Sequence, residues 1–118
     1  MPRLTTPLLR VTRVPNDRGP ALALDGELDL ATTPILMESL QACEHDDETV
    51  VALDLTDLRF LDASGLKAVL NAHRRAIRRG ERGLTLVNPS RDIRRLLELT
   101  AIDLTVEVVN NGTAPAPA

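Results

Sequence analysis

The sequence predicts a single α/β domain on a mixed, mostly parallel β-sheet, with the element order β-β-α-β-α-β-α-β. The chain has 118 residues, which suffices for one domain with a modest core. After two initial apolar runs, strand-like and helix-like segments alternate, and strands joined through helices are parallel. The runs 50–53 and 84–87 lack the polar alternation of half-exposed strands, which is typical of central parallel strands.

The first two strands are expected to form an antiparallel hairpin. They span 8–14 and 21–25, and the segment 15–20 between them is rich in Pro, Asn, Asp and Gly, a strong turn signal. Segment 26–29 is then expected to leave the sheet.

The first helix is expected to begin at Thr32 or Thr33 and to run to about Cys43. Either threonine is a suitable cap, and Pro34 falls in the first turn, where its missing N–H costs little. The candidate core residues of this helix are Ile35, Leu36, Leu40 and Cys43.

The third strand is expected at 50–55 and the second helix at 63–79. Asp62 is a suitable N-cap, because its carboxylate can accept a hydrogen bond from the free N–H groups of the first turn. Gly80 and Gly83 end the helix. Its apolar positions recur at helical spacing at Leu66, Val69, Leu70 and Ile77.

The last part of the chain is expected to hold a strand at 84–88, a helix from Pro89 or Ser90 to Leu99, and a strand at 104–109. Ile93, Leu96 and Leu97 form the buried side of that helix. We therefore expect one domain over 1–109 and a disordered tail over 110–118.

The charge of the chain is segregated. The net charge is −3, yet segment 67–95 has nine basic side chains and two acidic ones, about +7. A basic face is compatible with nucleic-acid binding. The arginines fall mostly on the polar sides and C-terminal ends of two helices, and Tyr and Trp are absent for base stacking. These facts favour a solvated face and no direct nucleic-acid contact.

The sequence favours a cytoplasmic protein. No run of 18 apolar residues predicts a membrane span, and the N-terminus lacks the apolar core of a signal peptide. The single cysteine, Cys43, excludes an intrachain disulfide and suits a reducing compartment.

The sequence contains little that predicts a catalytic or metal-binding site. No Cys/His spacing predicts a zinc site, and no glycine-rich phosphate loop is present, so no cofactor is expected. His73 lies nine residues beyond Ser64, about 13 Å along the same helix, too far to be its general base. Asp29, Asp54 and Asp62 converging at one sheet edge would leave acid–base chemistry as an alternative. We expect no enzyme.

A surface for protein docking is the remaining hypothesis. Segments 26–29 and 62–65 each follow a strand, and neighbouring parallel strands present such loops at one edge. The open start of the second helix would lie there beside carboxylates. The alternative is an ordinary strand–loop–helix junction with no function of its own.

Three stretches together resemble the anti-sigma factor antagonists of bacteria, which carry the STAS domain: DGELDLATTP, VVALDLTDLRFLDASGLKAVL and LTLVNPSRDIRRLLELTAID. The likeness covers about 8–109, and its specificity comes from GELD and D-[ST]-[ST]-G-L occurring together. It implies a STAS-like domain with helices packed mainly on one face. It also implies a protein that binds an anti-sigma factor of the serine-kinase type and so frees a sigma factor. We expect the chain to be a monomer or weak homodimer. In such systems the kinase phosphorylates the antagonist, and the phosphorylated antagonist releases the kinase. A PP2C-type phosphatase then removes the phosphate and resets this switch.

The resemblance assigns roles residue by residue. Asp29 matches the docking aspartate, Asp62 the aspartate before the phosphosite, and Ser64 and Gly65 the next motif positions. The partner-binding residues expected from both motifs are Glu27, Asp29, Asp62, Ala63, Ser64, Gly65 and Leu66.

One position departs from the family pattern. Ala63 stands where the usual phosphoacceptor serine is, and alanine has no hydroxyl. Three interpretations stay open: Ser64 is phosphorylated instead, the protein binds permanently without a switch, or it is a STAS module of a larger sensory complex or a small-ligand sensor. Where the unmodified first turn contacts the partner, we expect Phe60 and Leu66 to support the contact from beneath.

Overall fold

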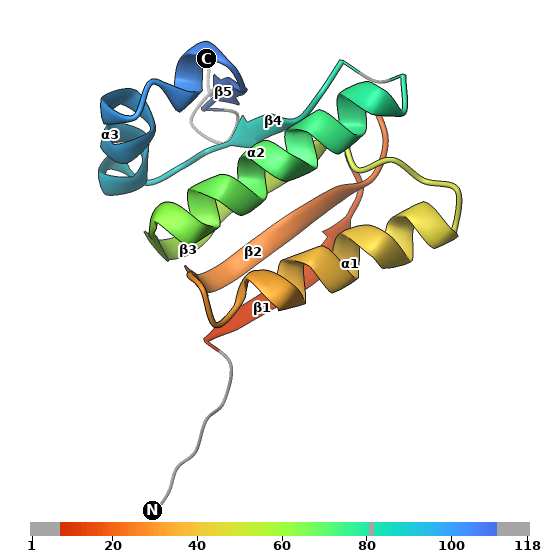
Figure 1. Ribbon diagram of the computed structural model, residues 1–118, viewed down its shortest axis with the longest axis horizontal. Helices are drawn as coiled ribbons and strands as arrows, with labels where there is room; N and C mark the ends of the chain where they lie inside the picture. The colour runs from red at the N-terminus through yellow and green to blue at the C-terminus, as the bar shows by residue number, and fades with distance from the viewer. Residues whose placement is uncertain (1–7, 81, 111–118) are drawn as a thin grey trace, which may run out of the picture.

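Helices cover one face of a five-stranded sheet in the computed structural model, which describes residues 8–80 and 82–110 (Figure 1). In chain order the elements are β1 (Leu9–Val14), β2 (Ala21–Leu28), α1 (Thr33–His45), β3 (Ala52–Leu61), α2 (Ala63–Arg78), β4 (Thr85–Val87), α3 (Arg91–Leu99), the 3₁₀ helix η1 (Ile102–Leu104) and β5 (Glu107–Val109). The strands lie in the order β1-β2-β3-β4-β5; β1 pairs antiparallel with β2, and the other pairs are parallel. The predicted fold class is confirmed. Apart from Asn110, the predicted tail lies outside the described residues.

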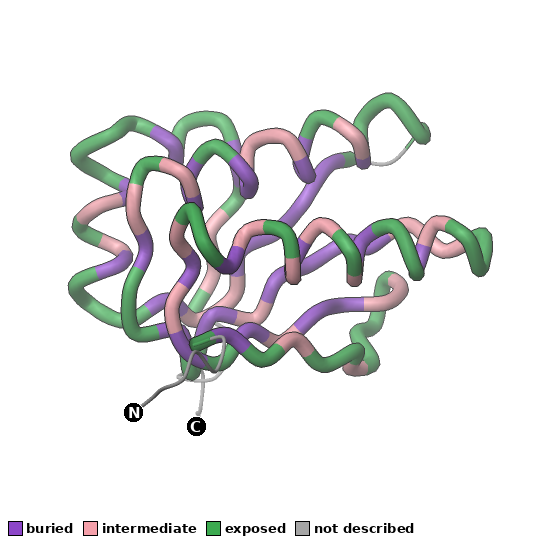
Figure 2. Tube along the Cα trace, turned by 60° about the horizontal axis from the view of Figure 1, so that its bottom comes forward, coloured by how far each residue is buried: buried purple, intermediate pink, exposed green. Residues whose placement is uncertain are grey.

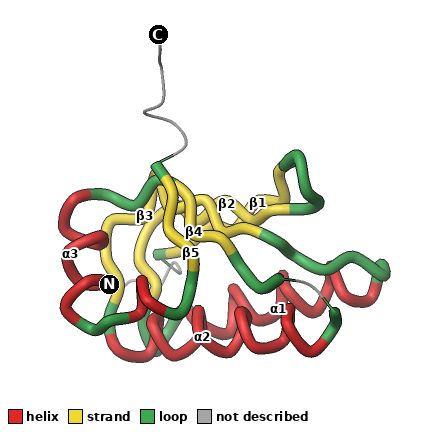
Figure 3. The backbone as a smooth tube through the Cα atoms, turned by 90° about the horizontal axis from the view of Figure 1, so that it is seen from above, coloured by secondary structure: helices red, strands yellow, loops and turns green. Residues whose placement is uncertain are grey.

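A single aliphatic core fills the space between sheet and helices. α1 and α2 lie side by side across one face of the sheet (Figure 3), and buried positions recur along the strands and on one side of each helix (Figure 2). Leu36 of α1, Val69 of α2 and Leu97 of α3 join the inward leucines of β2 and β3 in this core. With Phe60 as the only aromatic residue, the core is built from Leu, Val, Ile and Ala.

The strand β2 is longer than predicted, because Gly26 is a bulge and not a strand end. The register with β3 shifts between Gly26 and Glu27, and the Glu27 N–H donates to the Leu8 carbonyl at 2.7 Å. Gly26 has φ +123°, and a Cβ there would lie 2.0 Å from the Leu8 oxygen. The prediction that the chain leaves the sheet at Gly26 was therefore wrong; the glycine lets the strand bend and continue to Leu28.

The strand β3 also extends beyond its predicted end. Leu58 and Leu61 continue its buried side to the start of α2, although Thr56, Asp57 and Arg59 interrupt the apolar pattern. Leu55 and Leu58 are both buried but three positions apart, so strict alternation fails across the register shifts. Because Thr56 and Asp57 are polar, the apolar pattern predicts a strand end at 55.

The last predicted strand is shorter than expected. Ala101 has φ +60°, and residues Ile102–Leu104 form η1, which buries Ile102. Strand pairing starts only at Glu107. The apolar pattern of 104–109 therefore belongs partly to a turn that packs on α3.

The helix α2 follows its predicted bounds closely. Arg79 is the C-cap, and Gly80 follows with φ +89°, as expected for a helix end. Ile77 is 49% exposed, so its predicted place on the buried side was wrong; Ala72, His73 and Ala76 are buried instead. The imidazole of His73 packs on Gly83, and its Nδ1 accepts a hydrogen bond from the Leu84 N–H at 3.1 Å.

The second face of the sheet carries small and polar side chains. Ala21, Val51 and Ala52 form a small separate cluster there. The Arg18 side chain reaches across to donate to the Thr85 hydroxyl at 2.7 Å. None of the helices in the described part of the chain combines the length and apolar character needed to cross a bilayer.

Candidate functional site

The two predicted loops meet at one edge of the sheet. Leu28 and Leu61 are paired in the parallel ladder of β2 and β3, and Asp29 and Asp62 directly follow them. The Asp62 N–H donates to the Leu28 carbonyl at 3.3 Å. The starts of α1 and α2 consequently lie beside each other (Figure 1). The expectation that both motifs share one edge is confirmed.

The start of α2 is capped but open. Asp62 has extended backbone angles, and its Oδ1 accepts a hydrogen bond from the Gly65 N–H at 2.9 Å. Ala63 is exposed and Ser64 is half-buried. Within the described residues the Ser64 hydroxyl has no hydrogen-bond partner. The first turn thus presents a small apolar side chain and a free hydroxyl to whatever approaches it.

Gly65 holds the two motifs together. A Cβ at this position would lie 2.5 Å from the Leu28 carbonyl oxygen and 2.6 Å from a Leu61 methyl group. Only glycine allows α2 to approach the end of β2 this closely. Gly65 and Leu66 are buried, so they support the surface from within and do not belong to it.

Asp29 organises the entry to α1. Its Oδ1 accepts from the Thr32 N–H at 3.1 Å, and the Thr32 hydroxyl donates to the Glu27 carbonyl at 2.8 Å. Thr32 is the N-cap residue by position, but its hydroxyl makes no capping bond and instead fixes the loop. This role was not predicted, although the Asp-x-x-Thr spacing is a known local motif.

Two exposed hydrophobic side chains flank the carboxylates. Leu30 is 74% exposed next to Asp29. Phe60 is 47% exposed and is paired with half-buried Glu27 in the sheet ladder. The prediction that Phe60 supports the contact from beneath was wrong, because Phe60 lies on the open side of β3, whereas Leu66 is buried as expected. No sequence signal distinguished these two side chains.

Asp54 does not join the other two aspartates. It pairs with Val87 near the beginning of β3, and its carboxylate accepts from the Thr56 hydroxyl at 2.6 Å. The seven residues between it and Asp62 put the two carboxylates at opposite ends of a strand, roughly 25 Å apart. The predicted convergence of three carboxylates was wrong.

In the part of the chain that the structure describes, neither histidine lies at this edge. His73 is buried farther along α2 and accepts from a backbone N–H, and His45 is exposed at the end of α1. Among the described residues, no cluster of three His, Cys, Asp or Glu side chains could hold a metal ion. The arrangement offers a free hydroxyl, carboxylates and apolar side chains, which are the components of a binding surface.

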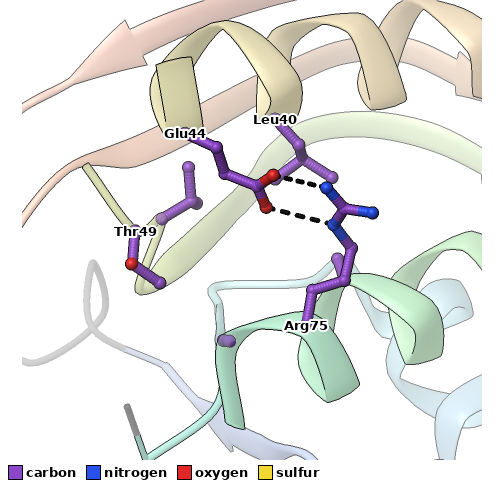
Figure 4. Close-up of a pocket in the computed structure, with 7 residues that line it drawn as sticks. Leu40, Glu44, Thr49 and Arg75 are labelled. Carbon is purple, nitrogen blue, oxygen red and sulfur yellow. Dashed lines mark hydrogen bonds and ion pairs between the residues drawn. The ribbon is translucent and has the colours of Figure 1, made fainter. Parts of the chain in front are cut away.

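A small hollow lies away from this edge. Between α1 and α2, Glu44 and Arg75 form a two-pronged ion pair above Leu40 and beside Thr49 (Figure 4). The hydrogen bond from the Arg75 guanidinium lowers the pKa of the Glu44 carboxyl. Because the two charges are already paired with each other, this hollow has the character of a helix–helix contact.

The chain belongs to the STAS domain family, whose model matches residues 10–112. The mixed sheet with its helices on one face is therefore a STAS domain fold.

Several relatives of this chain carry a common description. It is 29% identical to an anti-sigma-B factor antagonist of Listeria monocytogenes over 72% of this chain and 74% of that protein. It is 27% identical to an anti-sigma-B factor antagonist of Staphylococcus aureus over 89% and 95% of the two chains.

Solved structures agree with the fold. An anti-sigma factor antagonist from Mycobacterium paratuberculosis is 25% identical and superimposes with a TM-score of 0.75 over 90% of each chain. A structure from Thermotoga maritima described as a putative anti-sigma factor antagonist is 19% identical, with a TM-score of 0.71, and supports the fold alone.

Proposed function

We propose that this chain is an anti-sigma factor antagonist, which binds an anti-sigma factor and thereby frees a sigma factor to direct transcription. The descriptions of its relatives support this assignment. The observation that carries it is the juxtaposition of Asp29 and Asp62 beside the open first turn of α2. A partner can contact both motifs at once, because the two loops share one edge.

The contact surface consists of Glu27, Asp29, Asp62, Ala63 and Ser64, with Gly65 and Leu66 beneath it. The exposed Leu30 and Phe60 widen it with apolar area. The partner is an anti-sigma factor of the serine-kinase type. The chain itself catalyses no reaction and acts in the cytoplasm as a monomer or weak homodimer.

Phosphorylation at Ser64 would oppose this contact electrostatically. A phosphate adds a charge of about −1.5 to −2 next to the Asp62 carboxylate. Burying that charge against a partner without a matching arginine costs several kcal/mol, and about 4 kcal/mol corresponds to a thousandfold loss of affinity. With Ala63 in place of the usual serine, the alternatives are this displaced switch, with a PP2C-type phosphatase to reset it, and a permanently binding antagonist.

The deciding experiment uses the purified chain and each purified anti-sigma factor of the histidine-kinase-like ATPase class encoded in the same genome. We expect one of them to bind with a stoichiometry of one to one in titration calorimetry. Failure of all of them to bind contradicts the proposed function and favours a STAS module of a larger sensory complex or a small-ligand sensor.

The switch is tested on the same complex with ATP and mass spectrometry. Phosphate on Ser64 supports the displaced switch, and tight binding without transfer supports a permanent antagonist.

Ser64→Asp tests whether charge at this position weakens the contact. We expect at least a tenfold loss of affinity in calorimetry, because the added carboxylate lies beside Asp62 on the same surface and both charges must be buried against the partner. The matched control is Asn16→Asp, which adds the same charge in the turn before β2, at the opposite edge, and keeps an acceptor for the Arg18 N–H. Equal affinities of Ser64→Asp and the unmodified chain would rule out a charge switch here.

A further inference from the structure

The solvent face of α2 carries a row of cations that starts beside the candidate contact surface. Lys67, Arg74 and Arg78 are exposed, and half-buried Asn71 lies between them. At 3.6 residues per turn, these four positions fall within about 60° of helix arc. When Ala63 and Ser64 are included, the arc widens to roughly 100°. The buried positions of α2, such as Val69 and Ala76, occupy the opposite side. We name Lys67, Arg74 and Arg78 the basic row.

The side chains of the basic row are exposed to a partner, although the charge of Arg78 also helps to lower the pKa of the Glu44 carboxyl. Arg75 is paired with Glu44, and Arg79 donates to the Thr49 hydroxyl at 3.0 Å. In contrast, Lys67, Arg74 and Arg78 have no hydrogen-bond or ion-pair partner among the described residues. Helix-dipole complementarity accounts for Arg78 in the last turn. It does not account for Lys67, which lies near the N-terminus, where a cation is disfavoured.

We propose that the basic row is a second part of the anti-sigma factor contact and binds an acidic strip on that partner. This inference rests on the proposed function. A partner seated on Ala63 and Ser64 that continues along the same helix face meets Lys67 after one turn. It meets Arg74 and Arg78 about 15 and 21 Å from Ser64, at 1.5 Å of rise per residue. The docking face of the partner is therefore divided, with donors opposite Asp29 and Asp62 and carboxylates opposite the row.

Charge and composition favour a protein over a nucleic acid as the occupant. The row has three cations, begins beside the Asp62 and Asp29 carboxylates, which repel phosphates, and belongs to a chain of net charge −3. The only aromatic residue, Phe60, lies on the open side of β3, away from the helix face, so no ring is available along α2 to stack on a base.

Charge reversal tests the basic row in stopped-flow association with the anti-sigma factor that binds the chain in calorimetry. Arg74→Glu/Arg78→Glu is expected to lower the association rate constant at least tenfold in 50 mM salt, and the difference is expected to shrink in 0.5 M salt. The matched control is Arg91→Glu/Arg95→Glu on α3, which has the same spacing and the same change of charge on exposed residues. If the reversed α2 variant fails to fold by circular dichroism, the neutral changes Arg74→Gln and Arg78→Gln replace it.

Cross-linking provides an independent readout, because Lys67 is the only lysine in the chain. A carbodiimide joins an amine to a carboxylate in direct contact, so we expect mass spectrometry to find Lys67 linked to an Asp or Glu of the anti-sigma factor. Lys67→Arg is expected to remove this link and to keep binding.

The outcomes separate the two proposals. If no anti-sigma factor binds the unmodified chain, the proposed function and this inference both fail. If one binds, but charge reversal leaves association unchanged or Lys67 stays unlinked, only this inference is overturned. Salt-sensitive binding of a 20-base-pair DNA duplex that is lost in Arg74→Glu/Arg78→Glu, with anti-sigma factor binding intact, reassigns the row to nucleic acid.

Discussion

Two glycines perform different structural tasks at the ends of β2 and α2. Gly26 occupies a positive-φ bulge against Leu8, whereas Gly65 has an ordinary helical position and is required by the close approach of Leu28. Both are needed for the same result, because the bulge lets β2 reach Leu28 and the small residue lets α2 begin directly above it. The glycine of each motif thus positions an aspartate rather than contacting a partner.

Replacing Gly65 by alanine is expected to destabilise the protein by about 3 kcal/mol, since the added methyl group meets a backbone oxygen that cannot move away. In an unconstrained helix the same change stabilises by roughly 0.5–1 kcal/mol, so the sign of the effect is diagnostic. Urea denaturation measures it. Asn71→Ala on the outer side of α2 is the control, with a change of less than about 0.7 kcal/mol. A neutral or stabilising Gly65→Ala would contradict the close contact.

At the scale of elements, α1 and α2 are joined by a charged contact at one end. Glu44 comes from the last turn of α1 and Arg75 from the last turns of α2. Their side chains are 21% and 32% exposed, so water and salt screen the pair only partly. Leu40 and Ala72 lie against the same contact and exclude water from its inner side.

The ion pair predicts a pH dependence of stability with a definite sign. Because the folded state lowers the pKa of Glu44, its contribution is complete above the unfolded value of about 4.3. The contribution is lost as the pH falls through the lower folded pKa. We expect Glu44→Gln to cost about 1 kcal/mol at pH 7 and nothing once the carboxyl is protonated in both states.

Urea midpoints measured from pH 7 down to pH 2 check this expectation. Glu38→Gln removes an exposed carboxylate from the same helix and serves as the control. A loss of stability in Glu44→Gln that persists unchanged into the acid range would show that the side chain acts through packing and not through its charge.

For the whole molecule, the sheet is uneven in length. The ladder of β2 and β3 runs from the pair Ala21–Ala52 to the pair Leu28–Leu61. By contrast, β4 and β5 contribute three residues each. The site is built on the long pair, so its two aspartates are held by the most extensively paired part of the sheet. The short strands with α3 and η1 form an edge unit.

Native-state hydrogen exchange is expected to follow this division. Amides of the β2–β3 ladder should exchange slowest, through global unfolding, while those of 85–87 and 107–109 exchange faster through local opening. Equal protection across all five strands would show that the edge unit unfolds only with the rest. In either case the protection of Leu28 and Leu61 reports on how rigidly the site is held.

The order of the elements, the helix bounds near Asp62 and Ser90, and the meeting of the two motifs at one edge could all be predicted from the amino-acid sequence. These features depend on local signals, namely caps, apolar periodicity and the parallel pairing of strands joined through helices, which a linear pattern records. It also identified Asp29, Asp62 and Ser64 as one group of candidate residues.

Which apolar residues face outward, and where the strands end, could not be predicted in this way, because both depend on contacts between distant segments. Gly26 and the polar stretch before Leu58 have the composition of turns, but neighbouring strands satisfy their backbone groups and keep them in the sheet. Likewise, Leu30, Phe60 and Ile77 are as apolar as the core leucines, and their exposure depends on which side of an element meets the sheet. Burial is a property of packing between distant segments, and for that reason the surface around the site became visible only in the folded chain.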